Sequence, residues 1–401
     1  MAEQIGTVPS LPPSFDPFGD AFLGDPHPHL ETLREAGPLV YLKAHDAWAT
    51  GRHDVIAQIL SDNETFCSGR GVGLANFASE KPWRTPSLLL ETDPPDHTVN
   101  RTVISRALSP SVQRGLRAEF EHQADSFVAD AMRRGAFEAV DDFCIRVPLK
   151  VFADAVGVPE TGRAHLIAYG NMVFNTMGPE NDRYRRAMEN HEAVIAWVSN
   201  ACQRASLTAD GLGTMIYRAA DEETIDEASA ALIVRSFLSA GIDTTAAATA
   251  NLLYLFARHP EQWAKLKQDP GLTRNAIDEV LRLESPFQCY FRTTTGPVRI
   301  DGVTLAENAK VLLCLGAANR DRRRWTEPDT FDIARKATGH LAFGMGIHGC
   351  VGQMLARLEL EVLVTAMLER VAAFEFAGEP VWTKHNTLRT LDALPLRFVP
   401  Q

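Results

Sequence analysis

The chain has 401 residues, 45% of them hydrophobic and 23% charged, with a formal net charge of −11 at pH 7. This composition is that of a soluble globular protein with a large core, and the negative balance disfavours a nucleic-acid partner because a phosphate-binding surface is normally basic. Since no run reaches about 18 apolar residues and the N-terminus lacks the basic-then-apolar order of a signal peptide, we expect a cytoplasmic protein with no membrane partner.

Domain and redox signals are simple. Neither a Gly/Ser linker nor a repeat divides the chain, so the sequence predicts one domain over residues 1–401, with about the first 20 residues extended. The six cysteines are scattered and form no CxxC pair, which predicts free thiols rather than a disulfide framework or a zinc site. Five of them stand in ordinary apolar contexts, where a small buried hydrophobe is the expected role. Only Cys350 has unusual neighbours.

The spacing of hydrophobic residues predicts a mainly α-helical fold with small β-sheets. A short hairpin over residues 39–42 and 47–50 comes first, and a helix over 53–60 follows it. Further strands are expected over residues 298–305, 310–315 and 374–400. The predicted helices cover residues 111–134, 149–155, 183–203, 224–259, 260–268, 273–283 and 352–373.

The longest predicted helix, over residues 224–259, would cross the whole molecule at roughly 50 Å. Thr224 and Glu227 have the spacing of a capping box at its start. Gly241 stands in its middle, within the polar stretch 239–245, where glycine costs about 1 kcal/mol relative to alanine. Close approach of a ligand to the helix is one explanation for this glycine.

A second unusual stretch is HLAFGMGIHGCVG, residues 340–352, which places one cysteine among four glycines directly before a strong helix. Glycine is used where backbone turns sharply or comes close to another group. The N-terminus of the following helix points its N–H groups at the sulfur of Cys350, which favours the thiolate. The pattern predicts that something large and flat approaches this thiol.

These motifs together resemble the cytochrome P450 family, in the order in which that family carries them. The residues that carry the resemblance are Ala240-Gly241-x-Asp243-Thr244-Thr245, Glu279-x-x-Arg282, Ala318-Asn-Arg-Asp321 with Trp325 and Pro328, and Phe343-x-x-Gly346-x-His348-x-Cys350-x-Gly352. The resemblance implies the cytochrome P450 fold, with a long central helix over a haem b. It also implies a haem-thiolate monooxygenase that inserts one oxygen atom of O2 into a C–H bond.

The resemblance implies a residue set for the haem. Cys350 would be the axial iron ligand, because a thiolate supplies the electron density that O–O cleavage needs. Backbone at Gly346 and Gly352 would lie against the porphyrin, with Ala240, Gly241 and Phe343 beside it. The two haem carboxylates would be held by His97 and Arg101, on one face of a helix that begins after Pro95, and by Arg292 and His348. A solvated cation or a core histidine is the alternative for each of these four.

Asp243 and Thr244 match the acid and alcohol that the family places above the iron. The Thr244 hydroxyl is expected to bond the carbonyl of Ala240 and loosen the helix, while Asp243 links to solvent and protons pass through Thr244. A threonine that is only back-bonded inside a buried helix is the alternative.

Glu279 and Arg282 match the family's structural pair, with Arg335 as a third partner; a plain surface ion pair is the alternative. Arg322 stands where the family often has proline, which leaves the local turn open.

The resemblance also implies that electrons come from NAD(P)H through a 2Fe–2S ferredoxin and its flavin reductase. A cluster of four arginines, Arg320, Arg322, Arg323 and Arg324, suits an acidic partner in an otherwise acidic chain. Four ordinary surface arginines are the alternative.

Two segments suggest a substrate. Trp83-Arg84-Thr-Pro-Ser87 and Val234-Arg235-Ser236-Phe-Leu-Ser239 resemble the carboxylate-holding segments of bacterial members that oxidise para-substituted benzoates such as 4-methoxybenzoate. Ser236, Ser239, Asp243 and Thr244 recur at helical spacing and share one face. We expect Ser87, Ser236 and Ser239 to hold the carboxylate, with charge from Arg84 and Arg235. Aromatic and apolar lining would come from Leu90, Phe174, Met177, Phe287 and Tyr290, for which core packing is the equal alternative.

Other functions remain open at this point. If Arg84 and Arg235 pair with acidic side chains, the pocket takes a neutral small aromatic compound or a terpenoid. A haem-thiolate sensor or electron carrier and a peroxide-driven haem enzyme are further alternatives. The pair Asp243-Thr244 disfavours both, since neither needs proton delivery to bound oxygen.

Overall fold

The computed structural model describes residues 11–12 and 15–401, and it has the mainly helical architecture with small sheets that the sequence predicts. Its helices are α1 (Asp20–Gly24), α2 (Pro26–Ala36), α3 (His53–Ser61), α4 (Asp96–Ala107), α5 (Pro110–Arg134), α6 (Arg146–Val156), α7 (Ala164–Asn175), α8 (Asp182–Ala187), α9 (His191–Ala201), α10 (Leu212–Asp221), α11 (Glu227–Gly241), α12 (Asp243–Arg258), α13 (Pro260–Gln268), α14 (Thr273–Glu284), α15 (Leu315–Ala318) and α16 (Gln353–Arg370).

The strands form four sheets. They are β1 (Val40–Leu42), β2 (Ala47–Thr50), β3 (Phe66–Cys67), β4 (Ala136–Glu138), β5 (Cys289–Thr294), β6 (Val298–Ile300), β7 (Val303–Leu305), β8 (Lys310–Cys314), β9 (Val371–Phe376), β10 (Val381–Trp382), β11 (Leu391–Ala393) and β12 (Pro395–Pro400). The largest sheet has the order β1-β2-β8-β5-β3, and the smaller ones are β4-β12-β9, β10-β11 and β6-β7. In the largest sheet only β2 and β8 are parallel.

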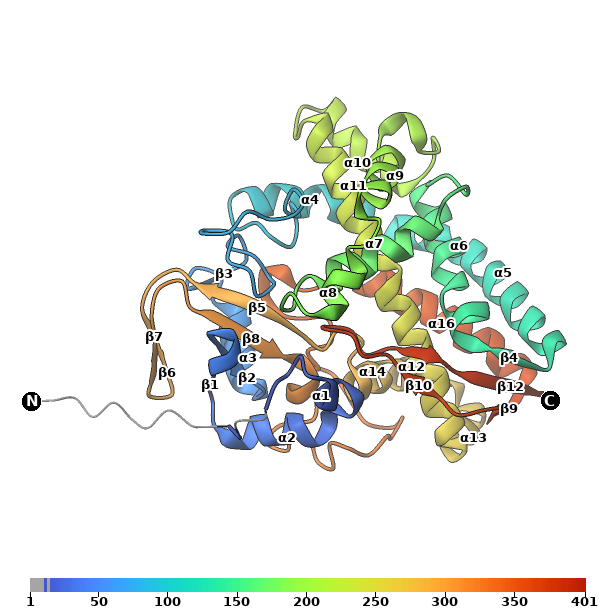
Figure 1. Cartoon of the computed structure of the whole chain (residues 1–401). Coiled ribbons are helices and arrows are strands. Elements are labelled where there is room, and N and C mark those ends of the chain that lie inside the picture. Colours follow the sequence, from blue (N-terminus) through green and yellow to red (C-terminus); the bar gives the residue numbers. More distant parts are fainter. Residues whose placement is uncertain (1–10, 13–14) are drawn as a thin grey trace, which may run out of the picture.

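The sheet and the helices occupy different sides of the molecule. Figure 1 shows the five-stranded sheet with its β6–β7 hairpin on the left and α5, α6 and α16 on the right. Between them α11 and α12 run from the top of the molecule through its middle, so the segment that carries Gly241, Asp243 and Thr244 lies at the centre. The extensive apolar core around these two helices includes Phe152, Phe237 and Phe256.

The predicted hairpin over residues 39–50 is confirmed, because Val40 pairs with Ala49 and Leu42 with Ala47. The hairpin over 298–305 is confirmed as well, and its turn residues Asp301 and Gly302 both have positive φ. This is the backbone geometry for which an Asp-Gly pair is favoured.

The predicted helix over 224–259 is wrong in two respects. It begins at Glu227, and its N-cap is Asp226, whose side chain accepts from the N–H of Ser229, so Thr224 does not form a capping box. It is also divided at Ile242, which separates α11 from α12. The hydrophobic period continues through the break, so periodicity alone could not reveal it.

Other elements also differ from the prediction. The helix predicted over 149–155 begins at Arg146, and α2, α7 and α10 were not predicted. Residues 183–203 form two helices, α8 and α9, because Asn190 adopts a left-handed conformation with φ of 60°. The C-terminal helix ends at Arg370, and Val371 already pairs in the sheet with β12.

Most of the N-terminus that the sequence predicts to be extended, residues 1–10 and 13–14, lies outside the described residues. Near its end the N–H of Gly19 donates to the Asp16 carbonyl in a turn, and Phe18 is buried.

The six cysteines all lie within the described residues and are free, and five of them are buried as expected. Over residues 11–12 and 15–401, no helix is long and apolar enough to cross a membrane. The single domain and the cytoplasmic location stay predictions.

Candidate active site

The cysteine loop is a compact turn folded back on itself. The N–H of Cys350 donates to the carbonyl of Phe343 at 2.8 Å, and Gly344 and Gly346 have φ of 66° and 70°. A Cβ at Gly346 would lie 2.1 Å from the carbonyl oxygen of Leu60, at the end of α3. Contact with α3 therefore accounts for glycine at this position, and its place against a porphyrin stays a prediction.

Cys350 follows this turn and stands directly before α16. Burial raises the pKa of its thiol, while the N–H groups of Gly352 and Gln353 and the charge of Arg101 lower the pKa. The N–H groups at the helix terminus thus favour the thiolate as expected, but burial outweighs them. A metal cation at the sulfur would supply what is missing, because a coordinating thiol is deprotonated by its metal.

One cavity lies between the cysteine loop and the central helices. Apolar and aromatic side chains form most of its wall, and the five predicted lining residues, Leu90 to Tyr290, are all part of it. It also gathers most of the predicted site residues: Arg84, Ser87, Arg101, Ser236, Ser239, Ala240, Gly241, Thr244, Tyr290, Arg292, Phe343, His348, Cys350 and Gly352. Apart from the structural pair Glu279 and Arg282, the predicted residues that do not line it are His97, Arg235 and Asp243.

Basic side chains gather at one side of this cavity. His97 lies behind His348, with ring centroids 4.2 Å apart, and burial lowers the pKa of His97 to about 4. Burial also lowers the pKa of Arg101 and of Arg292, and neither guanidinium makes an ion pair with a described residue. The buried Nε2 atoms of both histidines have no hydrogen-bond partner within residues 11–12 and 15–401.

One carboxylate lies near these basic side chains but does not neutralise their charge. Asp93 lies 3.9 Å from the Nε2 of His348, but its two oxygens already accept from the N–H groups of Ser68 and Gly69, each at 2.9 Å. Buried donors without acceptors are costly, so the group needs anions from outside the chain. Two haem carboxylates fit this requirement, and the free thiol of Cys350 on the same cavity fits the iron.

The helix opposite Cys350 is open where the sequence predicts it. The Thr244 hydroxyl donates to the carbonyl of Ala240 at 2.6 Å, which confirms the expected back-bond, and the helix is interrupted at Ile242. A Cβ at Gly241 would lie 2.5 Å from the ring of Phe152 in α6. Packing against Phe152 thus accounts for this glycine, in addition to its place on the cavity wall.

Asp243 points away from the cavity. A Cβ built on Gly170 of α7 would lie 1.5 Å from its Oδ2, so the carboxyl fills the space that a side chain at 170 would need. Burial raises the pKa of Asp243 to about 8, and its Oδ2 has no partner among the described residues. Asp243 as a whole is only partly buried, so its predicted link to solvent stays a prediction, and the raised pKa favours the protonated carboxyl.

The far end of the cavity carries the predicted carboxylate-holding residues. The hydroxyls of Ser87 and Ser236 lie 2.9 Å apart, and Ser239 donates to the carbonyl of Ser236 at 3.0 Å. Arg235 donates to the carbonyls of Thr85 and Pro86 rather than to an acid, and it fastens this loop to α11. Arg84 lines the cavity, but it forms an ion pair with Glu91 at 2.9 Å.

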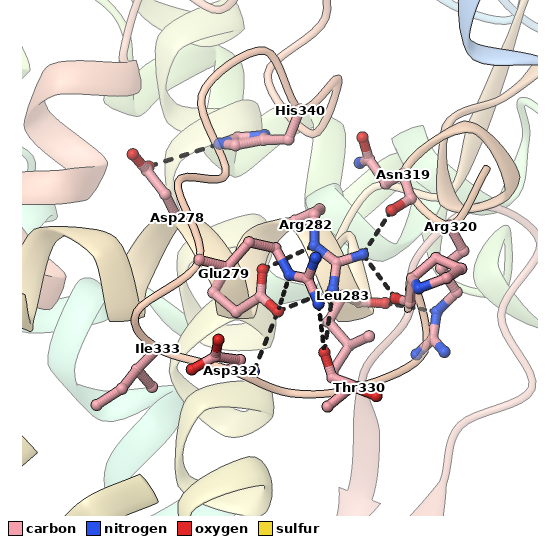
Figure 2. Close-up of polar contacts among 12 residues, drawn as sticks. Asp278, Glu279, Arg282, Leu283, Asn319, Arg320, Thr330, Asp332, Ile333 and His340 are labelled. Atoms are coloured by element: carbon pink, nitrogen blue, oxygen red, sulfur yellow. Dashed lines mark hydrogen bonds and ion pairs between the residues drawn. The ribbon is translucent and has the colours of Figure 1, made fainter. Parts of the chain in front are cut away.

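Glu279 and Arg282 lie away from the cavity in a buried polar cluster, which Figure 2 shows together with the segment 319–340. Both side chains are fully buried, and Arg282 contacts both carboxylate oxygens of Glu279, at 2.7 and 2.8 Å. Arg282 also donates to the carbonyls of Asn319 and Pro328, at 2.7 and 2.8 Å. The pair thus fastens α14 to the following segment, which excludes the surface ion pair.

The segment 318–335, which we call the meander, completes this cluster. Arg335 reaches Glu279 at 3.0 Å, in the position expected for the third partner. With Arg322 in place of proline, the local turn is closed by bonds from the N–H groups of Arg324 and Trp325 to the carbonyl of Asp321.

The four arginines expected to form a basic docking patch do not form one. Arg320 is buried and pairs with Glu284 and Asp329, while Arg322 and Arg323 pair with Glu31 and Glu35 of α2. Glu35 lies 288 positions from Arg323 in the chain, and Glu31 is similarly distant from Arg322, so sequence reasoning could not foresee these two pairings.

Two acidic residues of the site were missed by the sequence analysis. Glu91 pairs with Arg84, and only four residues separate it from Ser87. Glu359 of α16 lines the cavity fully buried, and burial raises its pKa to about 8. A signal for Glu359 was present, because it is spaced by helical periods from Leu355 and Val362 on a buried face.

Comparison with known proteins gives a consistent result. A family model described as Cytochrome P450 matches residues 181–392. The chain is 46% identical to cytochrome P450 CYP199A2 of Rhodopseudomonas palustris, over 98% of this chain and 95% of that protein. It is 31% identical to the cytochrome P450 monooxygenase PikC of Streptomyces venezuelae, over 98% and 96% of the two chains.

Solved structures agree with these sequences. The structure of P450BioI with an acyl carrier protein ligated by hexadec-9Z-enoic acid superposes with a TM-score of 0.84 at 28% identity. The match covers 94% of this chain and 100% of that one.

Proposed function

This chain belongs to the cytochrome P450 family, and from that premise we propose that it oxidises the para substituent of a small aromatic carboxylate, for which 4-methoxybenzoate is the model. It is a monooxygenase that uses O2 and electrons from redox partner proteins, with a haem whose iron is ligated by the thiolate of Cys350. The bound haem supplies the activation of oxygen for insertion into a C–H bond.

One observation carries the substrate proposal. Polar groups gather at one end of an otherwise apolar cavity, where the hydroxyls of Ser87 and Ser236 lie 2.9 Å apart beside Arg84. A buried carboxylate needs hydrogen-bond donors and positive charge, and this end provides both. Serine hydroxyls can turn to donate to an anion, since each is both donor and acceptor.

The spacing along α11 suits one aromatic ring. In an unbroken helix Ser239 and Ser236 would lie roughly 7.5 and 12 Å along the axis from Thr244, at 1.5 Å per residue, and the break at Ile242 alters these distances. A benzoate held at its carboxylate by Ser87 and Ser236 directs its para position toward Thr244 and Cys350. Phe174, Phe287 and Tyr290 form an aromatic wall between the two ends, with Phe287 and Tyr290 stacked 5.3 Å apart.

Thr244 and Asp243 serve proton supply in this proposal. The Thr244 hydroxyl is turned to the Ala240 carbonyl, so its oxygen can accept a proton donor while it holds its own proton. Asp243 carries a proton at neutral pH because burial raises its pKa to about 8. The carboxyl must leave its place against Gly170 before that proton can reach the cavity.

For electrons we propose a 2Fe–2S ferredoxin reduced by its flavin reductase from NAD(P)H. The neutralised arginines of residues 320–324 do not support a docking patch there, so the proposal names the partner class and no surface.

A second candidate rests on a specific observation. Arg84 already has a carboxylate partner in Glu91 at 2.9 Å, which would favour a neutral small aromatic or terpenoid ligand. Arg235 has no acidic partner among the described residues, but it donates to the carbonyls of Thr85 and Pro86 and does not line the cavity, so it favours neither candidate.

Spectroscopic titration of the haem protein separates the two candidates. We expect 4-methoxybenzoate to displace haem-bound water and to bind at least about tenfold more tightly than its methyl ester and its ortho isomer, which leave buried donors unpaired at about 1–3 kcal/mol each. Turnover with NADH, a ferredoxin and its reductase should give 4-hydroxybenzoate and formaldehyde. Tighter binding of the ester would overturn the carboxylate assignment, and binding without any turnover would favour a sensor.

A further inference from the structure

Two cavities meet at the ion pair between Arg84 and Glu91. The inner cavity is the candidate active site, and an outer one lies between residues 73–84 and 176–184. Arg84 lines both of them. Ser87 lines only the inner cavity and Glu91 only the outer one, so the pair stands at the boundary between them.

The pair is buried, yet the guanidinium of Arg84 is only partly used. The Arg84 and Glu91 side chains are 11% and 5% exposed. One terminal nitrogen of Arg84 donates to Glu91 at 2.9 Å and to the Thr85 carbonyl at 3.0 Å. The buried Nε has no partner within residues 11–12 and 15–401, so Arg84 keeps a donor for a second acceptor.

Glu91 is held firmly in this position. The carboxylate oxygen that pairs with Arg84 also accepts from the N–H of Ser87, at 2.7 Å. A carboxylate bound at Ser87 and Arg84 would therefore meet a fixed negative charge on the other side of the same guanidinium. Like charges at such a distance weaken each other's binding, and burial reduces screening by solvent.

Building on the proposed function, we propose that Glu91 determines the affinity of the site for the substrate carboxylate by sharing Arg84 with it. Without Glu91, Arg84 would be an uncompensated buried cation and would bind an anion tightly. With Glu91 in place, the anion gains only part of that charge, so its binding is weaker.

Weak binding at this end suits the reaction. Oxidation changes only the para substituent, so substrate and product present the same carboxylate to Arg84. Contacts between Arg84 and the carboxylate stabilise the bound substrate, transition state and product equally. They therefore do not accelerate the chemical step. A site that binds this group too tightly would retain its product.

Glu91→Gln tests the proposal, because glutamine removes the charge and its carbonyl oxygen can still accept from the N–H of Ser87. The probes are 4-methoxybenzoate and the neutral 4-methoxybenzamide, titrated against the holoprotein by the shift of the haem absorption band. The measured quantity is the ratio of acid to amide affinity. We expect the variant to raise this ratio at least about fivefold over the wild type, with the affinity for 4-hydroxybenzoate rising in parallel.

Glu180→Gln is the matched control, because Glu180 lines the outer cavity and makes no ion pair with a described residue. The ratio of acid to amide affinity in this variant should stay within about twofold of the wild-type ratio, since the charge of Glu180 is removed at a distance from Arg84. An equal rise in both variants would overturn the sharing of Arg84 in favour of a general field effect. An unchanged or lower ratio in Glu91→Gln would also overturn the sharing of Arg84, and would mean that Glu91 only positions Arg84.

If Glu91→Gln folds poorly, a second pair of variants still tests the proposal. Arg84→Met should lower the ratio, and the double variant Arg84→Met/Glu91→Gln should recover part of it, because the charge of Glu91 then no longer repels the acid. If Glu91 only orients Arg84, the double variant equals Arg84→Met, and the proposal fails. The proposed function is judged separately, by whether the wild-type ratio exceeds one.

Discussion

Two buried pairs of arginine and glutamate in this protein have different surroundings. Arg282 and Glu279 are fully buried, and Arg282 contacts both carboxylate oxygens and two backbone carbonyls. Arg84 and Glu91 are 11% and 5% exposed, and Arg84 keeps a buried Nε with no partner among the described residues. The first pair lies away from the cavity, and the second lies on its wall.

The difference shows how to separate a structural ion pair from a binding one. A buried charge whose donors are all satisfied fixes the segments around it and has nothing left to offer a ligand. A buried charge with an open donor next to a cavity is costly in the empty protein, and a ligand relieves that cost. An open donor beside the cavity, rather than burial, therefore distinguishes Arg84 from Arg282.

The largest effect is expected from Arg282→Met. It leaves Glu279 buried with only Arg335, so the free energy of unfolding should fall by about 3–5 kcal/mol. Urea unfolding, or the yield of haem-containing protein where the variant is too unstable, measures this loss. A loss below about 1 kcal/mol, the range of a surface pair, would contradict the structural interpretation.

Arg84→Met should act on binding instead. We expect the affinity for 4-methoxybenzoate to fall at least about tenfold, or about 1.4 kcal/mol, while the affinity for its methyl ester changes little. The stability loss should be smaller than for Arg282→Met, because fewer bonds are removed. A parallel loss of acid and ester binding would place Arg84 with the structural arginines.

The carboxyl of Asp243, whose Oδ2 has no partner among the described residues, can be compared with these two ion pairs. The pKa of Asp243 is raised to about 8 in the folded protein from an ordinary 3.8, so between these values the folded state holds a proton that the unfolded state has released. Stability contributed by this group is full below pH 3.8 and falls as the pH rises toward 8, by up to about 1.4 kcal/mol per pH unit.

Asp243→Asn carries no such proton. As the pH rises from about 5.5 to about 7.5, the free energy of unfolding of the wild type should therefore fall relative to that of the variant. Urea unfolding at several pH values measures the two slopes. Identical slopes would show that the carboxyl is ionised in the folded protein.

The smallest effect is expected from Arg322→Ala. Arg322 and Glu31 form an ion pair at 2.8 Å with side chains 65% and 46% exposed. Such pairs contribute about 0–1 kcal/mol and weaken in salt. A double-mutant cycle with Glu31→Ala in low and high salt measures the coupling. A coupling above about 2 kcal/mol would mean that exposure does not distinguish this pair from the buried ones.

The sequence predicted much of the fold and part of the site. Helices such as α5 and α13 follow directly from hydrophobic periodicity, and the hairpin turn at Asp301 and Gly302 follows from its residue types. Hydrophobic periodicity did not reveal the break at Ile242, because the apolar period continues through it, although the Thr244 back-bond predicted that the helix loosens there. The left-handed Asn190 divided a predicted helix for a similar reason.

Short motifs carried the resemblance to the family by themselves. Residues 340–352, 279–282 and 240–245 lie in continuous stretches, and through that resemblance they imply a thiol ligand, a structural pair and a polar gap in a helix. The reason is physical, since each motif acts through a local turn or one helical face and needs no knowledge of distant residues.

Only the tertiary structure decided how charges from distant segments are balanced. The pairing of Arg322 and Arg323 with α2, the enclosure of Asp243 against Gly170, and the satisfaction of Arg282 by the meander all join positions far apart in the chain. Whether a charged side chain is paired, buried or open to a ligand depends on which segments pack together. That depends on the packing of the whole core, which local patterns of sequence do not specify.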